Sequence, residues 1–359
     1  MRLMITSMRD EAPFILEWVA YHRLIGFTDF LIYSNDCADG TDALLDRLAE
    51  LGIVTHVPNP RRGRKTIQWQ ALSRAKNHKL ARRAEWIMVA DVDEFLVIHA
   101  GAGTLDDLFA TAPQAQGFAI SWRMFGSSGR VRFEPEPVTG QFTRAAPDDM
   151  IWPWRAAQFK SLFRNDPRLT RLGVHRPQTD DKDEVLEGWV DGSGRPYRMD
   201  KSAVAQTDPR RYAVAQINHY SVGSAENFMV KAERGRPNRM HLPIDLGYWV
   251  ERNFNEIEDR RILRHAPALR DAMDALLADP ELARLHRAGI AWRRERIAAL
   301  LADRDSFMRF SWLVQSPTTR FCRWKRRSCF RKCCTTACCR KGAVDPTLRA
   351  GVECRATSG

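Results

Sequence analysis

The first 90 residues alternate short apolar runs with segments whose apolar side chains recur every three or four positions. The apolar runs predict four strands, over residues 2–8, 30–34, 53–57 and 86–90. The periodic segments predict helices that begin at Asp10 and Thr41 and end at Gly26 and Gly52, and a third over 66–83. Strands and helices that alternate in this way build a mostly parallel sheet with helices on both faces. The sequence therefore predicts an α/β fold.

Acidic residues follow the fourth predicted strand directly, in the sequence WIMVADVDEFLV. In an extended chain, residues two apart face the same way, so Asp91 and Asp93 would aim both carboxylates at one point. Such carboxylates repel each other, and a divalent cation relieves the repulsion. Mg²⁺ and Mn²⁺ are the candidates, because Mg²⁺ binds one or two carboxylates together with substrate phosphates. A solvated acidic turn is the alternative, but the place at a strand end favours a metal site.

Two more polar segments follow predicted strands, Arg9–Glu11 and Asn35–Asp39. In parallel sheets, ligands bind beyond the carboxyl ends of the strands. We therefore expect these segments and Asp91–Glu94 to border one binding site.

The segment EAPFILEWVAYHRLIGFTDFLIYSNDCADGT resembles the opening of family 2 glycosyltransferases, and DVDEFL is similar to the D-x-D-E-F element of a branch related to family 92. The resemblance covers residues 1–240. It implies a GT-A fold, a nucleotide-sugar donor and inverting transfer to a glycan or lipid-linked acceptor. The resemblance implies that the nucleoside is held by Arg9, Glu11, Asn35 and Asp39. It implies that the metal and the diphosphate are bound at Asp91 and Asp93. Ser34 and Asn35 stand where many family 2 members have two aspartates, and Cys37 replaces a usual serine, so the contacts to the base differ.

Histidine and carboxylate candidates complete the site. His219 is the first candidate for a third metal ligand beside Asp91 and Asp93, and His175 the second; a structural histidine bonded to a loop carbonyl is the alternative. Catalytic candidates are Glu94, Asp181 and Asp183, one of which would take the acceptor's proton. An acidic surface loop explains residues 180–184 equally well.

Lysine and tryptophan residues supply further candidates. Lys160 or Lys231 would neutralise the leaving diphosphate, unless it is an ordinary surface lysine. Three tryptophans lie where an acceptor sugar would stack, or pack in the ordinary way: Trp122, Trp152 and Trp154. Trp18 and His22 are expected to pack the first helix against the sheet.

Charge and cysteine divide the chain into a nearly neutral body and a basic tail. Residues 320–359 hold 11 Lys and Arg and 2 Asp and Glu, a net charge of +9 out of +12. Seven of the eight cysteines also lie there, without the paired C-x₂-C spacing of zinc modules. We expect a disordered tail whose residues 320–341 contact anionic membranes; a shifted reading frame would also produce such a composition.

The predicted organisation has four segments: a nucleotide-sugar-binding half (1–105), an acceptor half (106–240), C-terminal helices (241–305) and the tail (306–359). No apolar stretch reaches the roughly 18 residues of a transmembrane helix and no signal peptide is evident, so we expect a cytoplasmic location, with membrane association through the tail. Two other functions stay open, a catalytically silent glycan- or nucleotide-binding protein and a nucleic-acid-binding protein. The near-neutral body disfavours nucleic acid, and the paired aspartates disfavour a silent protein.

Overall fold

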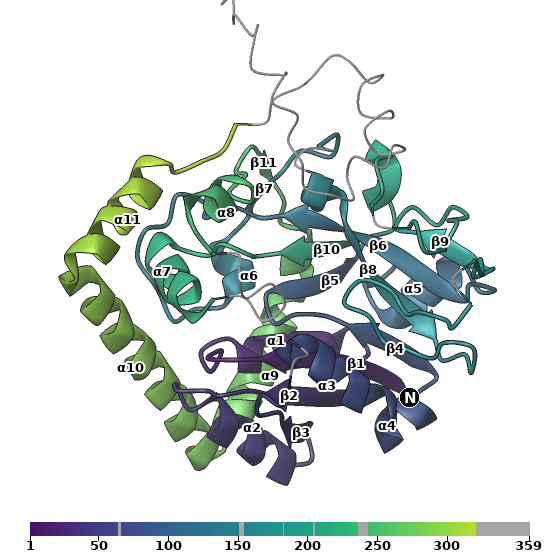
Figure 1. Ribbon diagram of the computed structural model, residues 1–359, viewed down its shortest axis with the longest axis horizontal. Coiled ribbons are helices and arrows are strands. Elements are labelled where there is room, and N and C mark those ends of the chain that lie inside the picture. The colour runs from purple at the N-terminus through teal and green to yellow at the C-terminus, as the bar shows by residue number, and fades with distance from the viewer. Residues whose placement is uncertain (64–65, 151–153, 182, 204, 236–242, 321–359) are drawn as a thin grey trace, which may run out of the picture. The chain divides into compact units, whose positions relative to one another are not determined.

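A mixed sheet of nine strands runs through residues 1–320 of the computed structural model (Figure 1). The structure describes residues 1–63, 66–150, 154–181, 183–203, 205–235 and 243–320. Along the sheet the strand order is β3-β2-β1-β4-β8-β6-β10-β5, and β9 pairs with β6. The strands are β1 (Arg2–Met8), β2 (Asp29–Ser34), β3 (Thr55–Pro58), β4 (Trp86–Val89), β5 (Glu94–Ile98), β6 (Gly117–Met124), β8 (Phe159–Arg164), β9 (Trp189–Asp191) and β10 (Ala215–His219).

The four strands predicted from the first 90 residues lie side by side and run parallel, in the order β3-β2-β1-β4. The apolar runs of β1, β2 and β4 are buried on both faces, whereas β3 at the edge of the sheet is only partly buried. In β1, Leu3 and Met4 face opposite ways and neither is exposed. The α/β fold with a mostly parallel sheet is thus confirmed.

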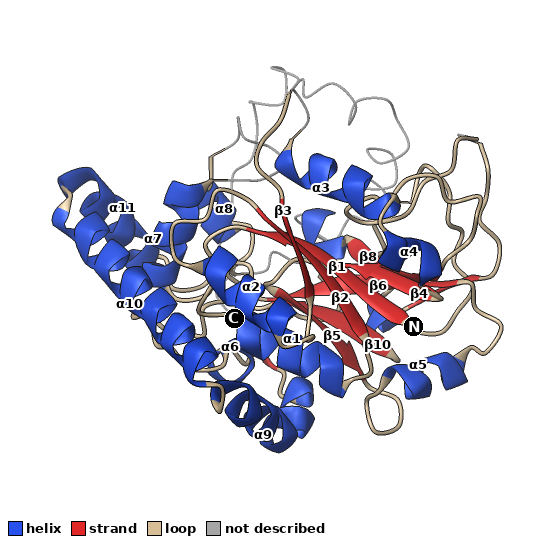
Figure 2. Cartoon of the chain, turned by 90° about the horizontal axis from the view of Figure 1, so that it is seen from below, coloured by secondary structure: helices blue, strands red, loops and turns tan. Residues whose placement is uncertain are grey.

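Helices cover both faces of this half of the sheet. Figure 2 shows α3 (Ile67–Lys76) and α4 (Lys79–Arg83) on one side of the sheet, with α1 (Ile15–Leu24) and α2 (Thr41–Glu50) on the other. The expected packing of the first helix is confirmed, because Trp18 and His22 are fully buried. The Trp18 indole donates to the carbonyl of Glu94, and His22 Nδ1 lies 2.9 Å from the carbonyl of Trp18.

Two predicted helix boundaries are wrong. The single helix expected over 66–83 is broken after Lys76, because the His78 side chain accepts a hydrogen bond from the amide of Leu80 and starts a second helix. Asp10 does not cap α1; its φ is 52° and its carboxylate accepts from the amide of Ala38, which ties the loop after β1 to the loop after β2.

The second half of the sheet is antiparallel in part. Strand β8 runs antiparallel to β4 and β6, and β5 runs antiparallel to β10. The run RVRF (130–133), which looks β-like, forms no strand, since the Phe133 amide donates to the Glu226 side chain instead of a ladder partner. The elements around this half are α5 (Leu105–Thr111), α6 (Val138–Gln141), η1 (Trp154–Ala157), η2 (Pro209–Tyr212) and a two-stranded sheet of β7 (Arg144–Ala145) and β11 (Ile257–Glu258).

Helices complete the C-terminal part: α7 (Ala225–Arg234), α8 (Leu246–Val250), η3 (Arg261–His265), α9 (Ala266–Leu277), α10 (Pro280–Ala302) and α11 (Arg304–Gln315). Helix α9 packs on α1, and α10 packs on α2 and α7. The helical C-terminal region is confirmed, and it continues through α11, past the boundary expected at residue 305. The tail beyond Arg320 lies outside the described residues. Among the described residues, no helix is both long enough and apolar enough to span a membrane.

Candidate active site

A cavity of about 720 Å³ opens at the carboxyl ends of β1, β2 and β4. The residues predicted for the site that line it include Arg9, Glu11, Asn35, Asp91, Asp93 and His219. These residues come from four separate strand ends, so the sheet brings together positions more than 200 residues apart in the sequence. The edge of the sheet predicted to bind ligand is where the cavity lies.

Asp91 and Asp93 lie in a tight turn and not in an extension of β4, which corrects the strand geometry expected from their spacing. The amide of Glu94 donates to the carbonyl of Asp91 at 3.0 Å, and the amide of Asp91 donates back to the Glu94 carboxylate at 2.9 Å. The turn still presents both aspartates to the cavity, because β5 begins at Glu94 and turns the chain back beside β10.

The Asp91 carboxylate accepts from two side chains in the cavity wall, Gln68 at 2.9 Å and Lys160 at 3.2 Å. Lys160 also lies 3.0 Å from Glu94, and both of these side chains are fully buried, whereas Asp91 is 35% exposed. Burial raises the pKa of Glu94; Lys160 opposes this, and Asp91 and Asp93 reinforce it. Glu94 is fully buried and does not line the cavity, and its carboxylate holds the backbone amide of Asp91.

The Asp93 carboxylate accepts from Lys231 at 2.6 Å and lies 3.8 Å from Nε2 of His219. Burial alone would raise the pKa of Asp93, but Lys231 and His219 outweigh it and hold the pKa well below its usual range. Burial lowers the pKa of His219, and the nearby Asp93 carboxylate opposes this shift. Its Nδ1 atom is buried and has no hydrogen-bond partner among the described residues.

Trp122 lies between two histidines on the same wall. Its ring centroid is 4.5 Å from that of His219 and 5.1 Å from that of His175. His175 Nδ1 lies 2.9 Å from the backbone carbonyl of Phe159, which fits the alternative of a structural histidine bonded to a carbonyl. Burial lowers the pKa of His175 to about 4. Trp152 and the side chain of Trp154 lie outside the described part of the chain.

Positive charge exceeds negative charge on the cavity wall. The cations that line it are Arg9, Arg61, Arg176, Lys231, Arg234 and Arg252, against the carboxylates Glu11, Asp36, Asp91 and Asp93. Among the described lining residues, six cations and four carboxylates give a net charge of +2, which favours the binding of an anion. Arg234 is fixed by ion pairing with Glu11 and by the carbonyl of Arg9.

Three predicted site residues lie elsewhere. Asp39 is buried outside the cavity and accepts from the amides of Ala12 and Thr41, both at 2.9 Å. Asp181 and Asp183 lie on an exposed loop, where Asp183 pairs with Lys201. The structure thus does not bring these three carboxylates to Asp91 and Asp93.

Other cavity residues are not singled out by the sequence. Gln68 gives no signal in its helical pattern, and Arg234 is recognisable only through its i, i+3 spacing from Lys231 on α7, which puts both on one helix face. Tyr248 on α8, whose ring lies 3.7 Å below the Arg252 guanidinium, carries no motif.

A divalent cation fits this site in part. Among the described residues, no three His, Cys, Asp or Glu side chains lie close enough to hold one ion, so Asp91, Asp93 and His219 do not form a closed ligand set. Asp91 and Asp93 nevertheless keep 35% and 23% of their side chains exposed toward one cavity. Two such carboxylates suit an ion whose remaining ligands come from a substrate diphosphate.

The model of glycosyltransferase family 92 matches residues 5–243. This match covers more than half of the chain, which therefore belongs to glycosyltransferase family 92. The prediction of a glycosyltransferase is confirmed at the level of the family. The family is family 92, to which the sequence motifs were already related, and not family 2.

Similar proteins share only part of their length with this chain. A rice (Oryza sativa subsp. japonica) family 92 protein is 31% identical over 183 residues, 47% of this chain and 28% of that protein. A family 92 protein of Ricinus communis is 29% identical over 147 residues, covering 38% and 25%. The chain thus spans about a quarter of the length of these curated relatives.

Among solved structures, S. aureus TarS 1–349 in complex with UDP aligns over 46% of this chain and 47% of that chain, with 13% identity and a TM-score of 0.28. Another structure of TarS 1–349 aligns over 88% and 91%, with 11% identity and a TM-score of 0.30. The fold described above rests on this chain's own strand order, not on these scores.

Proposed function

We propose that this protein transfers a sugar from a nucleotide-diphosphate sugar to a hydroxyl group of a glycan or lipid-linked acceptor, within a GT-A fold. One observation carries the proposal: Asp91 and Asp93 line a cavity with six cations, in the part of the chain that matches family 92. The nucleotide of the donor and the cytoplasmic location stay predictions.

The donor's diphosphate would bind between the two aspartates and the cations of α7. Lys231 and Arg234 both line the cavity, and Lys231 is already placed by Asp93 and by the carbonyl of Ser221 at 2.8 Å. Asp91 and Asp93 would hold Mn²⁺ or Mg²⁺. When bound, this ion would stabilise the charge that develops on the leaving diphosphate.

The remaining contacts fix the geometry of these groups. Gln68 and Lys160 hold the Asp91 carboxylate from one side, and Glu94 holds its backbone amide. The Trp122 indole is buried between His175 and His219 and holds this part of the cavity wall in place. Inversion at the anomeric carbon is what the family resemblance implies.

The test is turnover of a panel of nucleotide sugars by the full chain. Wild type is expected to turn over one of them with Mn²⁺ or Mg²⁺ and to stop in excess chelator. Asp93→Asn is expected to lower turnover at least about 100-fold, since even outer partners of a metal ligand are worth roughly 10- to 100-fold. The matched control is Asp271→Asn, an exposed carboxylate on α9, which should keep full turnover.

Full turnover by Asp93→Asn, or turnover in excess chelator, would contradict the role of the paired aspartates. Binding of a nucleotide sugar by wild type without any turnover would favour the catalytically silent alternative.

A further inference from the structure

Trp69 of α3 is an exposed aromatic side chain on the wall of the candidate active-site cavity. It is 39% exposed, although large aromatic side chains usually lie in the core. Two other Trp or Tyr rings belong to the described lining of the cavity: Trp122 is buried, and the ring of Tyr248 is covered by the guanidinium of Arg252. Of these three rings, that of Trp69 is the one left exposed.

No protein group occupies the Trp69 ring within the part of the chain that the structure describes. Its side chain forms no hydrogen bond there and contacts no other ring or cation. The tryptophans of the neighbouring elements differ in this respect: the Trp18 indole donates to a backbone carbonyl, and the ring of Trp86 stacks on that of Phe109 at 4.3 Å. The face of Trp69 is therefore open to a flat group that enters the cavity.

Helix α3 holds Trp69 rigidly. On its inner side, Leu72 and Ala75 are buried in the core against β1 and β2. Near its beginning, the Gln70 amide donates to the side chain of Asn59 at 2.8 Å, which ties the helix to the loop after β3. An aromatic side chain on such a fixed element loses little freedom when a ligand ring stacks on it.

The position of Trp69 relative to the paired aspartates indicates which part of a donor reaches it. The preceding residue, Gln68, donates to the Asp91 carboxylate at 2.9 Å. Strand β2 lies on one side of β1 and β4 lies on the other, so the strand order reverses at β1, and ligands of α/β sheets bind in the crevice at such a point. A diphosphate held at Asp91 therefore places one end of the donor beside the beginning of α3.

The chemistry of this part of the wall fits a nucleobase. A base has two flat faces and an edge of hydrogen-bond donors and acceptors. The ends of β1 and β2 and the loop after β3 supply amide, carboxylate and guanidinium groups to the same cavity, from Asn35, Asp36, Arg9 and Arg61. These groups suit the edge of a base, and the Trp69 ring suits its face.

We propose that Trp69 binds the nucleobase of the donor by stacking on it. This inference rests on the proposed function, because it assigns a contact to the donor's nucleotide. Every base has a π face, so the stack contributes affinity and does not itself choose among bases.

The test is calorimetric titration of the full chain with UDP, GDP, ADP and CDP in the presence of Mn²⁺, and with pyrophosphate as a probe without a base. Trp69→Ala is expected to weaken the binding of each nucleoside diphosphate that wild type binds, by at least about fivefold. Pyrophosphate should bind this variant as it binds wild type. Trp69→Phe keeps an aromatic face and should recover part of the loss.

The matched control is Trp312→Ala, which removes an exposed tryptophan of α11 that does not line the cavity and should bind as wild type does. Equal losses of nucleoside diphosphate and pyrophosphate in Trp69→Ala would show that Trp69 only shapes the wall, and would overturn the proposal. Unchanged binding of nucleoside diphosphates by this variant would overturn it as well. A raised KM for the acceptor would then assign the ring to the acceptor.

Donor kinetics separate this inference from the proposed function. Trp69→Ala should raise the donor KM at least about fivefold and leave kcat nearly unchanged, because a stack formed equally in the ground state and the transition state affects binding alone. Wild-type turnover with an unchanged donor KM in Trp69→Ala would refute this inference and leave the proposed function standing. Binding of nucleoside diphosphates that depends on Trp69, without turnover of any nucleotide sugar, would support the stack and refute the transfer. A wild type that binds none of the four would refute both.

Discussion

Lys160 lies behind the cavity wall, fully buried, and its ammonium group lies within 3.2 Å of both Asp91 and Glu94. Burial would lower the pKa of Lys160, but the two carboxylates outweigh it and raise the pKa, so the lysine stays charged. Removing one partner of a buried ion pair leaves the other charge without compensation, which costs more than the pair itself contributes.

Lys160→Met is therefore expected to lower the free energy of unfolding by about 3 kcal/mol. Adding Glu94→Gln should restore part of this loss, because glutamine still accepts from the amide of Asp91 and carries no charge to bury. Urea denaturation of the two single variants and the double variant measures the coupling. Strictly additive losses would show that Lys160 does not stabilise Glu94.

The sequence predicted correctly that Asp91 and Asp93 border the cavity, but it did not predict the positions of Glu94, Asp181 and Asp183. Asp91 and Asp93 follow an apolar strand, so their place at the sheet edge was readable from the pattern. The burial of Glu94 behind them was not, because it depends on Lys160 from β8, about 70 residues further along the chain. The exposed loop of Asp181 and Asp183 has no periodicity that fixes its path.

At the scale of elements, Asp39 joins the beginnings of two helices. One carboxylate oxygen accepts from the amide of Thr41 at the start of α2, and the other accepts from the amide of Ala12, ahead of α1. The resemblance assigned Asp39 to the nucleoside, but among the described residues it is buried outside the cavity lining.

Asp39→Ala is expected to lower the free energy of unfolding by about 2 kcal/mol, because two buried amides lose their acceptor. The KM for the donor should change little in the folded variant. Urea denaturation and donor kinetics on the same preparation measure both effects. A large rise in KM with unchanged stability would instead restore the nucleoside role.

Elements were predictable where one local pattern decides them. Three of the first four strands are apolar runs buried on both faces, and the helices between the four strands predict their parallel direction, which the structure confirms. The break between α3 and α4 was missed because it depends on a single histidine hydrogen bond. The antiparallel pairing of β8 with β4 and β6, and of β5 with β10, could not be predicted from the sequence. The long segments between these strands have no helical or strand periodicity that would fix how the chain crosses the sheet.

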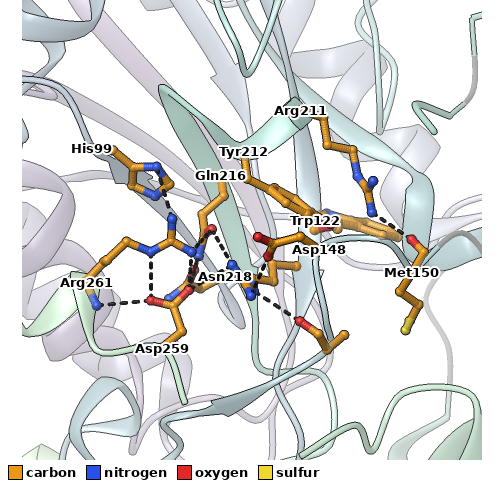
Figure 3. Close-up of polar contacts among 12 residues, drawn as sticks. His99, Trp122, Asp148, Met150, Arg211, Tyr212, Gln216, Asn218, Asp259 and Arg261 are labelled. Carbon is orange, nitrogen blue, oxygen red and sulfur yellow. Dashed lines mark hydrogen bonds and ion pairs between the residues drawn. The ribbon is translucent and has the colours of Figure 1, made fainter. Parts of the chain in front are cut away.

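At the scale of the whole molecule, a polar network ties the second half of the sheet to the segments around it (Figure 3). Asp259, just after β11, is almost completely buried, pairs with Arg261 and accepts from Gln216 of β10 at 2.9 Å. Arg123 of β6 reaches the same carboxylate at 3.3 Å. Burial would raise the pKa of Asp259, but these partners outweigh it and lower the pKa. The network fixes β10, at whose end His219 enters the cavity.

The C-terminal helix α10 also supports the cavity, although it lies beyond the residues that match family 92. Arg293 on α10 is buried and donates to the carbonyl of Asp10 and to the side chain of Asn227 on α7. One turn earlier, Gly289 lies against Ala12; a Cβ atom added at Gly289 would be 2.5 Å from the Cβ of Ala12. The loop that carries Arg9 and Glu11 to the cavity therefore depends on close contact with this helix.

Gly289→Ala is expected to push α10 away from that loop, because neither Cβ atom can rotate aside. Overpacking costs about 1–3 kcal/mol, which exceeds the gain of roughly 1 kcal/mol in helix propensity, so the variant should be less stable and its donor KM higher. The matched control is Ala291→Gly on the exposed side of α10, which loses about 1 kcal/mol of helix propensity and should leave KM unchanged. If both variants left KM unchanged, the cavity would be independent of α10, and the family-matched residues would be sufficient to shape it.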